Sequence, residues 1–346
     1  MSKMSYTLEE NSAHRLHLAD VETRPAFLRG WERVRHRQAH WAIEMLAEMF
    51  GVFFYCYAGV GATAAYVLAN ALKMTTLASL LTIGFAYALG VVLALVVASG
   101  TSGGHFNPAV TVTWVLFKGM PVAKGARYIF AQILGGYLTC LLIYLQYRTL
   151  IRDVEGVLIA TGTYDAVQFT PAGPAGIFAL YAPSPTLGLI FINEFVVDFF
   201  IGMVIFTCMD PTNFLAPPVM GPWLVGFAYA VAIWSYSPVG LAANAARDVG
   251  GRLAALTIWG SAASGGSYAA IAALTNIPAT LLAYVVYQVI FTDSSRVITN
   301  AQKEFRAGHL AHMEHRHSVS SRSHLMQPNS PDLEKGTEQR VEHHRH

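Results

Sequence analysis

The stretch Ser102-Gly103-Gly104-His105-Phe106-Asn107-Pro108-Ala109-Val110-Thr111 decides the fold class of this chain. A second stretch, Gly240-Leu241-Ala242-Ala243-Asn244-Ala245-Ala246-Arg247-Asp248, has the same design. Each follows a long apolar segment and places an asparagine at the start of a short helix at membrane depth. An unpaired polar group is costly there and persists where it lines a cavity. The pair therefore predicts two pore-lining half-helices.

The composition agrees with a membrane protein. Of the 346 residues, 54% are hydrophobic and 13% are charged, whereas about a quarter of residues are charged in an ordinary soluble domain. A transmembrane helix needs about 20 apolar residues, and six stretches are long enough. They are Trp41–Val67, Leu77–Ser99, Val122–Tyr147, Leu187–Met209, Pro217–Tyr236 and Ser267–Phe291.

The distribution of basic residues predicts the orientation, although the net charge is only +2. Cytoplasmic segments next to spans carry an excess of Lys and Arg. Basic residues precede the first span and follow the Asn107 segment, so both places are expected in the cytoplasm. These residues are Arg24, Arg29, Arg33, Arg35, Arg37, Lys118, Lys124 and Arg127. With six spans, both termini are cytoplasmic. The polar first 40 residues show no signal-peptide pattern.

An internal repeat relates the two halves of the body. The sequence Gly-Phe-Ala-Tyr-Ala occurs at 84–88 and again at 226–230, and Glu48 in the first span matches Glu194 in the fourth. Three spans per half is an odd number, so the halves have opposite orientations. Inverted repeats commonly form their sites from broken helices near the membrane midplane. We therefore predict an all-α membrane protein with six transmembrane helices and two re-entrant half-helices.

The chain divides on this basis into tails and a channel-like body. Residues 1–40 are expected as a cytoplasmic tail, in which Phe27–Trp31 forms either an interfacial amphipathic helix or a plug at the pore entrance. The body, 41–291, consists of a first repeat (41–148), an extracellular connection (149–186) that folds over the outer mouth, and a second repeat (187–291). Residues 292–346 are polar and rich in His, so we expect a disordered cytoplasmic tail.

The asparagines and the arginine have a physical role in such a pore. Asn caps a helix whose first N–H groups lack partners, and its amide still donates to a passing solute. Pro108 is suited to the first helical position, whereas Ala245 stands there in the second motif. The positive ends of the two half-helices repel cations. Arg247 adds a permanent charge and fixed donors. Asp248 is expected to orient Arg247 or the nearby backbone.

The other polar residues of the spans favour structural roles. Glu48 and Glu194 are expected to accept backbone N–H groups from the irregular segments before each half-helix. An enzyme using them as an acid/base pair would need partners that the sequence does not offer. Cys56, Cys140 and Cys208 are expected as reduced packing residues. No spacing resembles a metal site, and we expect no metal, cofactor or nucleic acid. Asp198 is an extra intramembrane carboxylate that either lines the pore or pairs within the bundle.

At these motifs the chain resembles the major intrinsic protein family, and within it the fungal aquaglyceroporins. The resemblance covers about Trp41–Phe291 and includes the two motifs, the arginine, the glutamates and the repeat. Asp248 after the arginine, and the segments Asp210–Asn213 and Phe178–Ala182, are similar to the glycerol-conducting branch. His105 and Asp248 are supporting residues on this comparison. The resemblance also implies a homotetramer with one pore in each subunit.

The resemblance further implies a selectivity filter at family offsets from the two asparagines. These offsets place it at Tyr87, Ala232, Leu241 and Arg247. A small Ala232, where strict water channels carry histidine, favours glycerol. Two departures stand out: the second motif is Asn244-Ala245-Ala246 instead of Asn-Pro-Ala, and Gly251 replaces a proline.

The expected function is passive conduction of glycerol and water, with hydrogen peroxide as a further solute, across the plasma membrane. The pore would exclude protons and ions. Two alternatives stay open: a channel for water and hydrogen peroxide with little glycerol flux, and a gated or non-conducting membrane protein that acts through its tails.

Overall fold

The computed structural model describes residues 18–74 and 79–325, in which the secondary structure is helical. The chain divides into two compact units. The first comprises Met1–Arg37 and Gly308–His346, and the second comprises Gln38–Ala307. The predicted body therefore lies in the second unit, together with the functional residues discussed below.

Five helices in the described part of the chain are long and apolar enough to cross a membrane. They are α3 (His40–Ala71), α4 (Leu80–Ser102), α6 (Val122–Ala160), α8 (Leu187–Met209) and the segment Tyr268–Phe291. That last segment contains α11 (Tyr268–Leu274), α12 (Asn276–Val286) and the π-helical turn η4 (Tyr287–Phe291). The predicted fifth span corresponds to α9 (Gly221–Tyr236), which has 16 residues.

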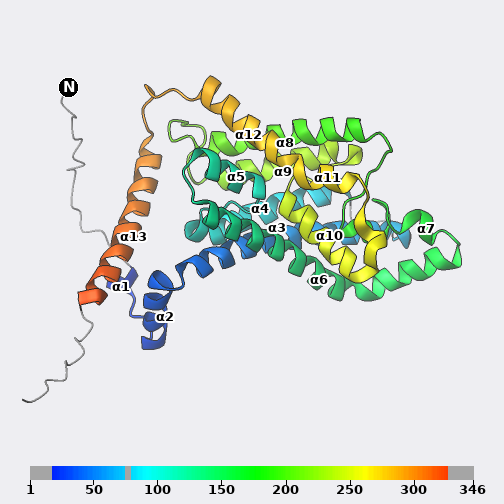
Figure 1. The fold of residues 1–346 in the computed structure, drawn as a ribbon, viewed down its shortest axis with the longest axis horizontal. Helices are drawn as coiled ribbons and strands as arrows, with labels where there is room; N and C mark the ends of the chain where they lie inside the picture. The colour runs from blue at the N-terminus through cyan, green and yellow to red at the C-terminus, as the bar shows by residue number, and fades with distance from the viewer. Residues whose placement is uncertain (1–17, 75–78, 326–346) are drawn as a thin grey trace, which may run out of the picture. The chain divides into compact units, whose positions relative to one another are not determined.

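The two predicted half-helices are present. They are α5 (Pro108–Phe117) and α10 (Ala245–Trp259), and each is capped by the asparagine of its motif. Helix α5 packs against α6 and α12, and α10 packs against α6. Among the longer helices, α3 packs on α4 and α6, α4 on α9, and α8 on α9 and α12 (Figure 1).

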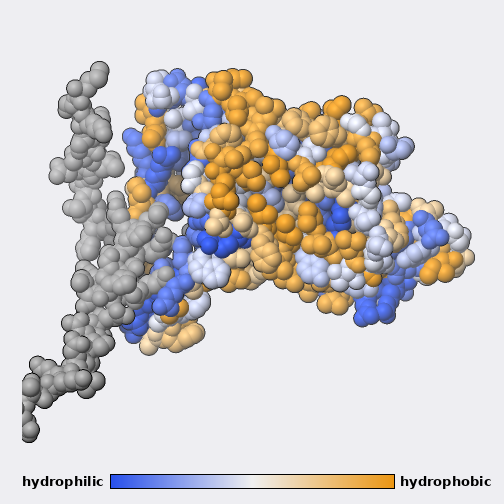
Figure 2. All heavy atoms as spheres, viewed as in Figure 1, coloured by the Kyte–Doolittle hydropathy of each residue, from blue (hydrophilic) through white to orange (hydrophobic). Residues whose placement is uncertain are grey.

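The outer surface of the helical body is apolar, as membrane helices require. Figure 2 shows hydrophobic side chains over most of the visible face of this body, with hydrophilic residues gathered toward its ends. Long hydrophobic side chains on several helices remain exposed, among them Leu93, Val96, Phe130, Leu145, Ile192 and Val196. In a membrane these side chains contact lipid.

Glycines allow the half-helix α10 to approach its neighbours closely. A Cβ atom on Gly136 of α6 would lie 2.7 Å from the carbonyl oxygen of Ala246, and one on Gly250 would lie 2.7 Å from the nitrogen of Tyr137. A Cβ on Gly135 would lie 2.5 Å from the carbonyl oxygen of Met49. The Gly135-Gly136 pair therefore serves contacts within one chain.

The connection between the repeats differs from the expected loop over 149–186. Its first part continues α6 to Ala160, so that α6 has 39 residues and a length of about 58 Å. This exceeds the hydrocarbon thickness of about 30 Å. The sequence explains the extension, because Arg148–Ala160 contains no proline and one glycine. The short helix α7 (Tyr164–Val167) and the 3₁₀ turn η1 (Pro174–Ile177) follow.

The tails also contain helices. In the first unit, α1 (Leu18–Val21) precedes α2 (Ala26–Arg37), and α2 includes the Phe27–Trp31 region. Arg24, just before α2, forms an ion pair with Glu32 inside it. The expectation of disorder throughout 292–346 is wrong for Asn300–Leu325, which forms α13. Good helix formers fill residues 301–307, which accounts for this helix. Residues 326–346 lie outside the described residues.

Candidate functional site

Glu48 organises the segment before the first half-helix. One carboxylate oxygen accepts from the hydroxyl of Ser102 at 2.6 Å and the backbone N–H of His105 at 3.0 Å. The other accepts from the N–H of Phe106 and the amide of Gln132, both at 2.7 Å. Glu48 is fully buried. Its hydrogen bonds therefore replace the water that this irregular backbone would otherwise need.

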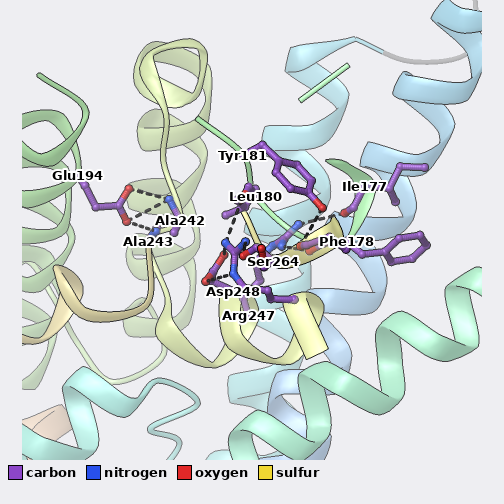
Figure 3. Close-up of polar contacts among 12 residues, drawn as sticks. Ile177, Phe178, Leu180, Tyr181, Glu194, Ala242, Ala243, Arg247, Asp248 and Ser264 are labelled. Atoms are coloured by element: carbon purple, nitrogen blue, oxygen red, sulfur yellow. Dashed lines mark hydrogen bonds and ion pairs between the residues drawn. The ribbon is translucent and has the colours of Figure 1, made fainter. Parts of the chain in front are cut away.

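Glu194 has the same role in the second half. Its carboxylate accepts from the backbone N–H of Ala242 at 2.7 Å and from that of Ala243 at 2.7 Å (Figure 3). Glu194 is fully buried as well. The backbone bonds that the sequence predicts for both glutamates are thus present, at matching places in the two repeats.

The repeat extends to the backbone conformation. The residue before each asparagine adopts the left-handed backbone conformation: φ is +48° at Phe106 and +57° at Ala243. This conformation costs a residue with a side chain roughly 1–2 kcal/mol. The N–H groups of these two residues are held by Glu48 and Glu194. The glutamates therefore stabilise a strained turn that directs each chain into its half-helix.

Both asparagines cap their helices with similar geometry. The Oδ1 atom of Asn107 accepts from the N–H of Ala109 at 2.9 Å, and that of Asn244 accepts from Ala246 at 2.9 Å. Their φ angles are −148° and −159°. Ala245 in place of proline therefore leaves the second cap in the same conformation as the first.

Arg247 projects from the first turn of α10 and is almost fully buried. Its Nε donates to the hydroxyl of Tyr87 at 3.1 Å. Its two terminal nitrogens donate to backbone carbonyls in the connection between repeats: Nη1 to Phe178 at 2.5 Å and Nη2 to Ile177 at 3.2 Å (Figure 3). These bonds hold the guanidinium in one orientation.

Asp248 does not bond to Arg247. It forms an ion pair with Arg252, one turn later, in which Nη2 lies 2.6 Å from the carboxylate. Arg252 also donates to the carbonyls of Leu180 and Ser264, both at 2.9 Å. Of the two roles expected for Asp248, positioning the nearby backbone is therefore the one that the structure supports.

A cavity of about 450 Å³ lies beside the second motif. Four of the predicted pore residues line it: Tyr87, Leu241, Asn244 and Arg247. Residues of the connection between repeats also line it, including Pro171, Gly176, Tyr181 and Pro183. Burial raises the pKa of Tyr181 to about 12, so its hydroxyl keeps its proton and donates to the carbonyl of Ala263.

Ala232, which the family offset places in the filter, does not line this cavity. Ala232 is fully buried in the main hydrophobic core, whereas its neighbour Ile233 lines the cavity. Successive residues of a helix point about 100° apart, so Ala232 and Ile233 face different sides of α9. Tyr87, Ile233, Leu241 and Arg247 thus line the cavity together, and the filter assignment of Ala232 stays a prediction.

The sequence reasoning also missed cavity residues. Tyr55 of α3 and Tyr229 of α9 line the cavity, and the side chain of Tyr229 lies against both Asn107 and Asn244. Tyr229 is the counterpart of Tyr87 in the sequence repeat, a signal that was sufficient to find it. Gln132, which connects Glu48 to Thr111, had no such signal.

The remaining predicted residues have structural surroundings. His105 bonds to Thr111 at 3.1 Å and packs against the rings of Trp114 and Tyr128. Asp198 is fully buried beside Glu194 and Asn276 and does not line the cavity. Neither carboxylate oxygen of Asp198 has a hydrogen-bond partner among the described residues, so its pairing within the bundle stays a prediction. Among the described residues, no three His, Cys, Asp or Glu side chains gather as a metal site.

Comparisons with known proteins agree with this geometry. The model of the major intrinsic protein family matches residues 35–263. An aquaporin of Laccaria bicolor is 50% identical over 312 residues, which cover 89% of this chain and 94% of that protein. Aquaglyceroporin-2 of Rhizophagus irregularis is 34% identical over 230 residues, covering 65% and 67% of the two chains.

The fold is also found among solved structures. The X-ray structure of the aquaglyceroporin from Plasmodium falciparum aligns with a TM-score of 0.61 at 21% identity, covering 72% of this chain and 96% of that chain. The fold is therefore that of an aquaporin-like bundle. Together with the family match, this shows that the chain belongs to the major intrinsic protein family and is a multi-pass membrane channel, not an enzyme.

Proposed function

We propose that this channel conducts glycerol and water, with hydrogen peroxide as a further solute, and excludes protons and ions. The observation that carries the proposal is that Tyr87, Ile233, Leu241 and Arg247 line one cavity; we refer to these four residues as the ring. Three members present hydrocarbon or aromatic surface, and the fourth presents N–H donors. Glycerol has a carbon-bearing edge and a hydroxyl-bearing edge, which match these two sides.

Arg247 supports both conduction and exclusion. Its guanidinium has five N–H groups, and its hydrogen bonds to Tyr87, Ile177 and Phe178 engage three of them within the described structure. The remaining N–H groups can donate to a solute hydroxyl. Its permanent charge opposes cations, and so do the positive ends of α5 and α10.

The likeness to Aquaglyceroporin-2 of Rhizophagus irregularis adds to the case for glycerol. A second candidate, a channel for water and hydrogen peroxide with little glycerol flux, is favoured by one observation. Ile233 occupies the place in the ring where a small residue would leave more space. The assembly that we propose is a homotetramer in the plasma membrane. Six spans place both termini on one side, and the arginines before α3 favour the cytoplasmic side.

The test is stopped-flow light scattering on proteoliposomes containing the full chain, with glycerol and impermeant-osmolyte gradients. We expect glycerol re-swelling well above that of empty liposomes. Ile233→His should reduce glycerol permeability more than water permeability, because it replaces hydrocarbon surface facing the carbon-bearing edge of glycerol with a polar imidazole. Val231→Ala, on the exposed face of the same helix, is the control.

The outcomes separate the two candidates. Water permeability with background glycerol permeability would contradict glycerol conduction and support the second candidate. Background rates for both solutes would contradict the proposed conduction altogether.

A further inference from the structure

Helix α2 carries an exposed apolar stripe. Phe27, Trp31 and Val34 are spaced four and three residues apart, so they lie on one face of the helix. Their exposed fractions are 78%, 45% and 44%, and the rest of the described structure leaves this face largely uncovered. A row of large apolar side chains on one helix face is typical of a surface that packs against a partner or a membrane.

The arginines of α2 lack anionic partners. Because successive helical residues turn by about 100°, Arg33 and Arg35 flank the stripe on its two sides and Arg29 lies on the opposite face. The acidic residue of the helix, Glu32, is engaged by Arg24. No ion pair involves the other three arginines within the described residues. The buried Nε of Arg35 has no hydrogen-bond partner there either.

The position of α2 in the chain brings it to the membrane surface. Helix α2 ends at Arg37, and α3, which is long and apolar enough to cross a membrane, begins at His40. Three residue steps span at most about 11 Å. The last turn of α2 is therefore close to the lipid headgroups around the start of α3, whatever direction the helix takes.

Anionic phospholipids match both surfaces of α2. The boundary between headgroups and acyl chains accepts the apolar face of a helix, and guanidinium groups form paired hydrogen bonds with phosphates. The cytoplasmic leaflet is rich in anionic lipids, and the basic residues before α3 favour that side of the membrane.

A plug at the pore entrance fits these observations less well. It would bring arginines into a passage toward which both half-helices direct their positive ends. It would also leave the charge of the arginines without a counter-ion. A membrane surface with anionic lipid accommodates the apolar stripe and the charge together.

We propose that α2 is a binding site for anionic phospholipids and lies along the cytoplasmic surface of the membrane. Phe27, Trp31 and Val34 contact the acyl chains, and Arg33 and Arg35 bind the lipid phosphates. The site anchors the N-terminal segment next to the first span. It does not depend on which solutes the channel conducts, so this inference and the proposed function can fail separately.

The experiment places the full chain in nanodiscs of phosphatidylcholine alone or of phosphatidylcholine with phosphatidylserine. Hydrogen exchange with mass spectrometry measures the protection of the α2 amides, and peptides from α3 and α6 report whether each variant is folded. The test variant is Arg33→Gln/Arg35→Gln. Lys303→Gln/Arg306→Gln is the matched control, because it removes the same charge from exposed positions of α13.

We expect the α2 amides of the wild type and the control to exchange about tenfold more slowly with phosphatidylserine present, because each arginine near an anionic surface strengthens binding about fivefold. High salt should reduce this difference. In Arg33→Gln/Arg35→Gln it should fall below about twofold. Phe27→Ser/Trp31→Ser should exchange rapidly in both discs, because the apolar contact is lost.

Two results would overturn the inference. Equal, rapid exchange of wild-type α2 in both discs would show that the helix does not bind the membrane. Equal, slow exchange in both discs would show that α2 is protected without anionic lipid. In that case, a rise in water permeability on deletion of residues 1–37 would identify it as a plug.

Discussion

The side-chain amide of Asn244 in the second motif donates a 3.0 Å hydrogen bond to the backbone carbonyl of Phe106 in the first motif. Phe106 is the left-handed residue whose N–H is held by Glu48. The bond therefore links the two inverted repeats where their half-helices begin. It makes the geometry of each motif depend on the other.

Asn244→Asp tests this link. The remaining carboxylate oxygen can still cap α10, but the donor to Phe106 is replaced by an acceptor that faces the carbonyl oxygen. We expect a loss of about 2 kcal/mol of stability and at least a tenfold fall in solute permeability. Thermal unfolding in detergent and proteoliposome flux measure the two effects. Asn300→Asp, at an exposed position, serves as control, and wild-type stability in Asn244→Asp would argue against the link.

Glu194→Gln should weaken the second re-entrant segment. The glutamine amide places N–H groups where the carboxylate accepts from Ala242 and Ala243. Hydrogen bonds to charged groups contribute about 1.5–3 kcal/mol, so the melting temperature should fall by several degrees. Asp165→Asn, at an exposed position, should leave it unchanged. A Glu194→Gln protein that melts like the wild type would show that the charge is not needed.

Arg252→Met should destabilise the channel through Asp248. Asp248 is fully buried, and removing one partner of a buried ion pair costs about 3–5 kcal/mol because the other charge is left uncompensated. The double variant Asp248→Asn/Arg252→Met should be more stable than Arg252→Met alone. Melting temperatures of both single variants and of the double variant complete this double-mutant cycle. If the loss of stability in the double variant equalled the sum of the two single losses, the ion pair would not contribute to stability.

Ala245→Pro should be tolerated and mildly stabilising. The cap at Asn244 already has the geometry found before Pro108, and a compatible proline stabilises by about 0.4–1 kcal/mol by restricting the unfolded chain. We expect a small rise in melting temperature, with water and glycerol permeabilities within twofold of wild type. A large loss of flux would show that the N–H of Ala245 has a role in conduction.

Asp210 should make stability depend on acidic pH. It follows α8, where burial alone would raise its pKa, but hydrogen bonds from Thr212 and Tyr287 outweigh this and the net pKa is lowered. Because the pKa of Asp210 is lower in the folded state than in the unfolded state, its ionised carboxylate stabilises the fold above the unfolded pKa of about 4. This stabilisation disappears as the pH falls through the folded pKa. The melting temperature should therefore drop below about pH 4, and Asp210→Asn should reduce that drop.

Much of this architecture was predictable from local sequence. The apolar stretches, the repeated Gly-Phe-Ala-Tyr-Ala segment and the two asparagine motifs are short-range signals of membrane helices and capped half-helices. The roles of Glu48 and Glu194 were predictable for a related reason: a carboxylate in an apolar span needs donors, and the irregular segments were the places with free N–H groups.

Other features depend on contacts that no local pattern contains. The guanidinium of Arg247 is oriented by carbonyls of Ile177 and Phe178, about seventy residues earlier. Residues 149–160 were expected to belong to the connection between the repeats, yet they continue α6 to Ala160. Ile233, the residue after Ala232, lines the cavity, and the packing of α9 rather than its local sequence decides which of the two does so.

The sequence by itself thus determined the membrane class, the inverted repeat and the chemistry at Asn107, Asn244 and Arg247, because hydropathy and capping act over a few neighbouring residues. Only the tertiary structure decided which side chains share the cavity, among them Tyr55, Tyr229 and Ile233. Which face of a helix meets the pore depends on how all the helices pack together, and that packing is a property of the whole chain.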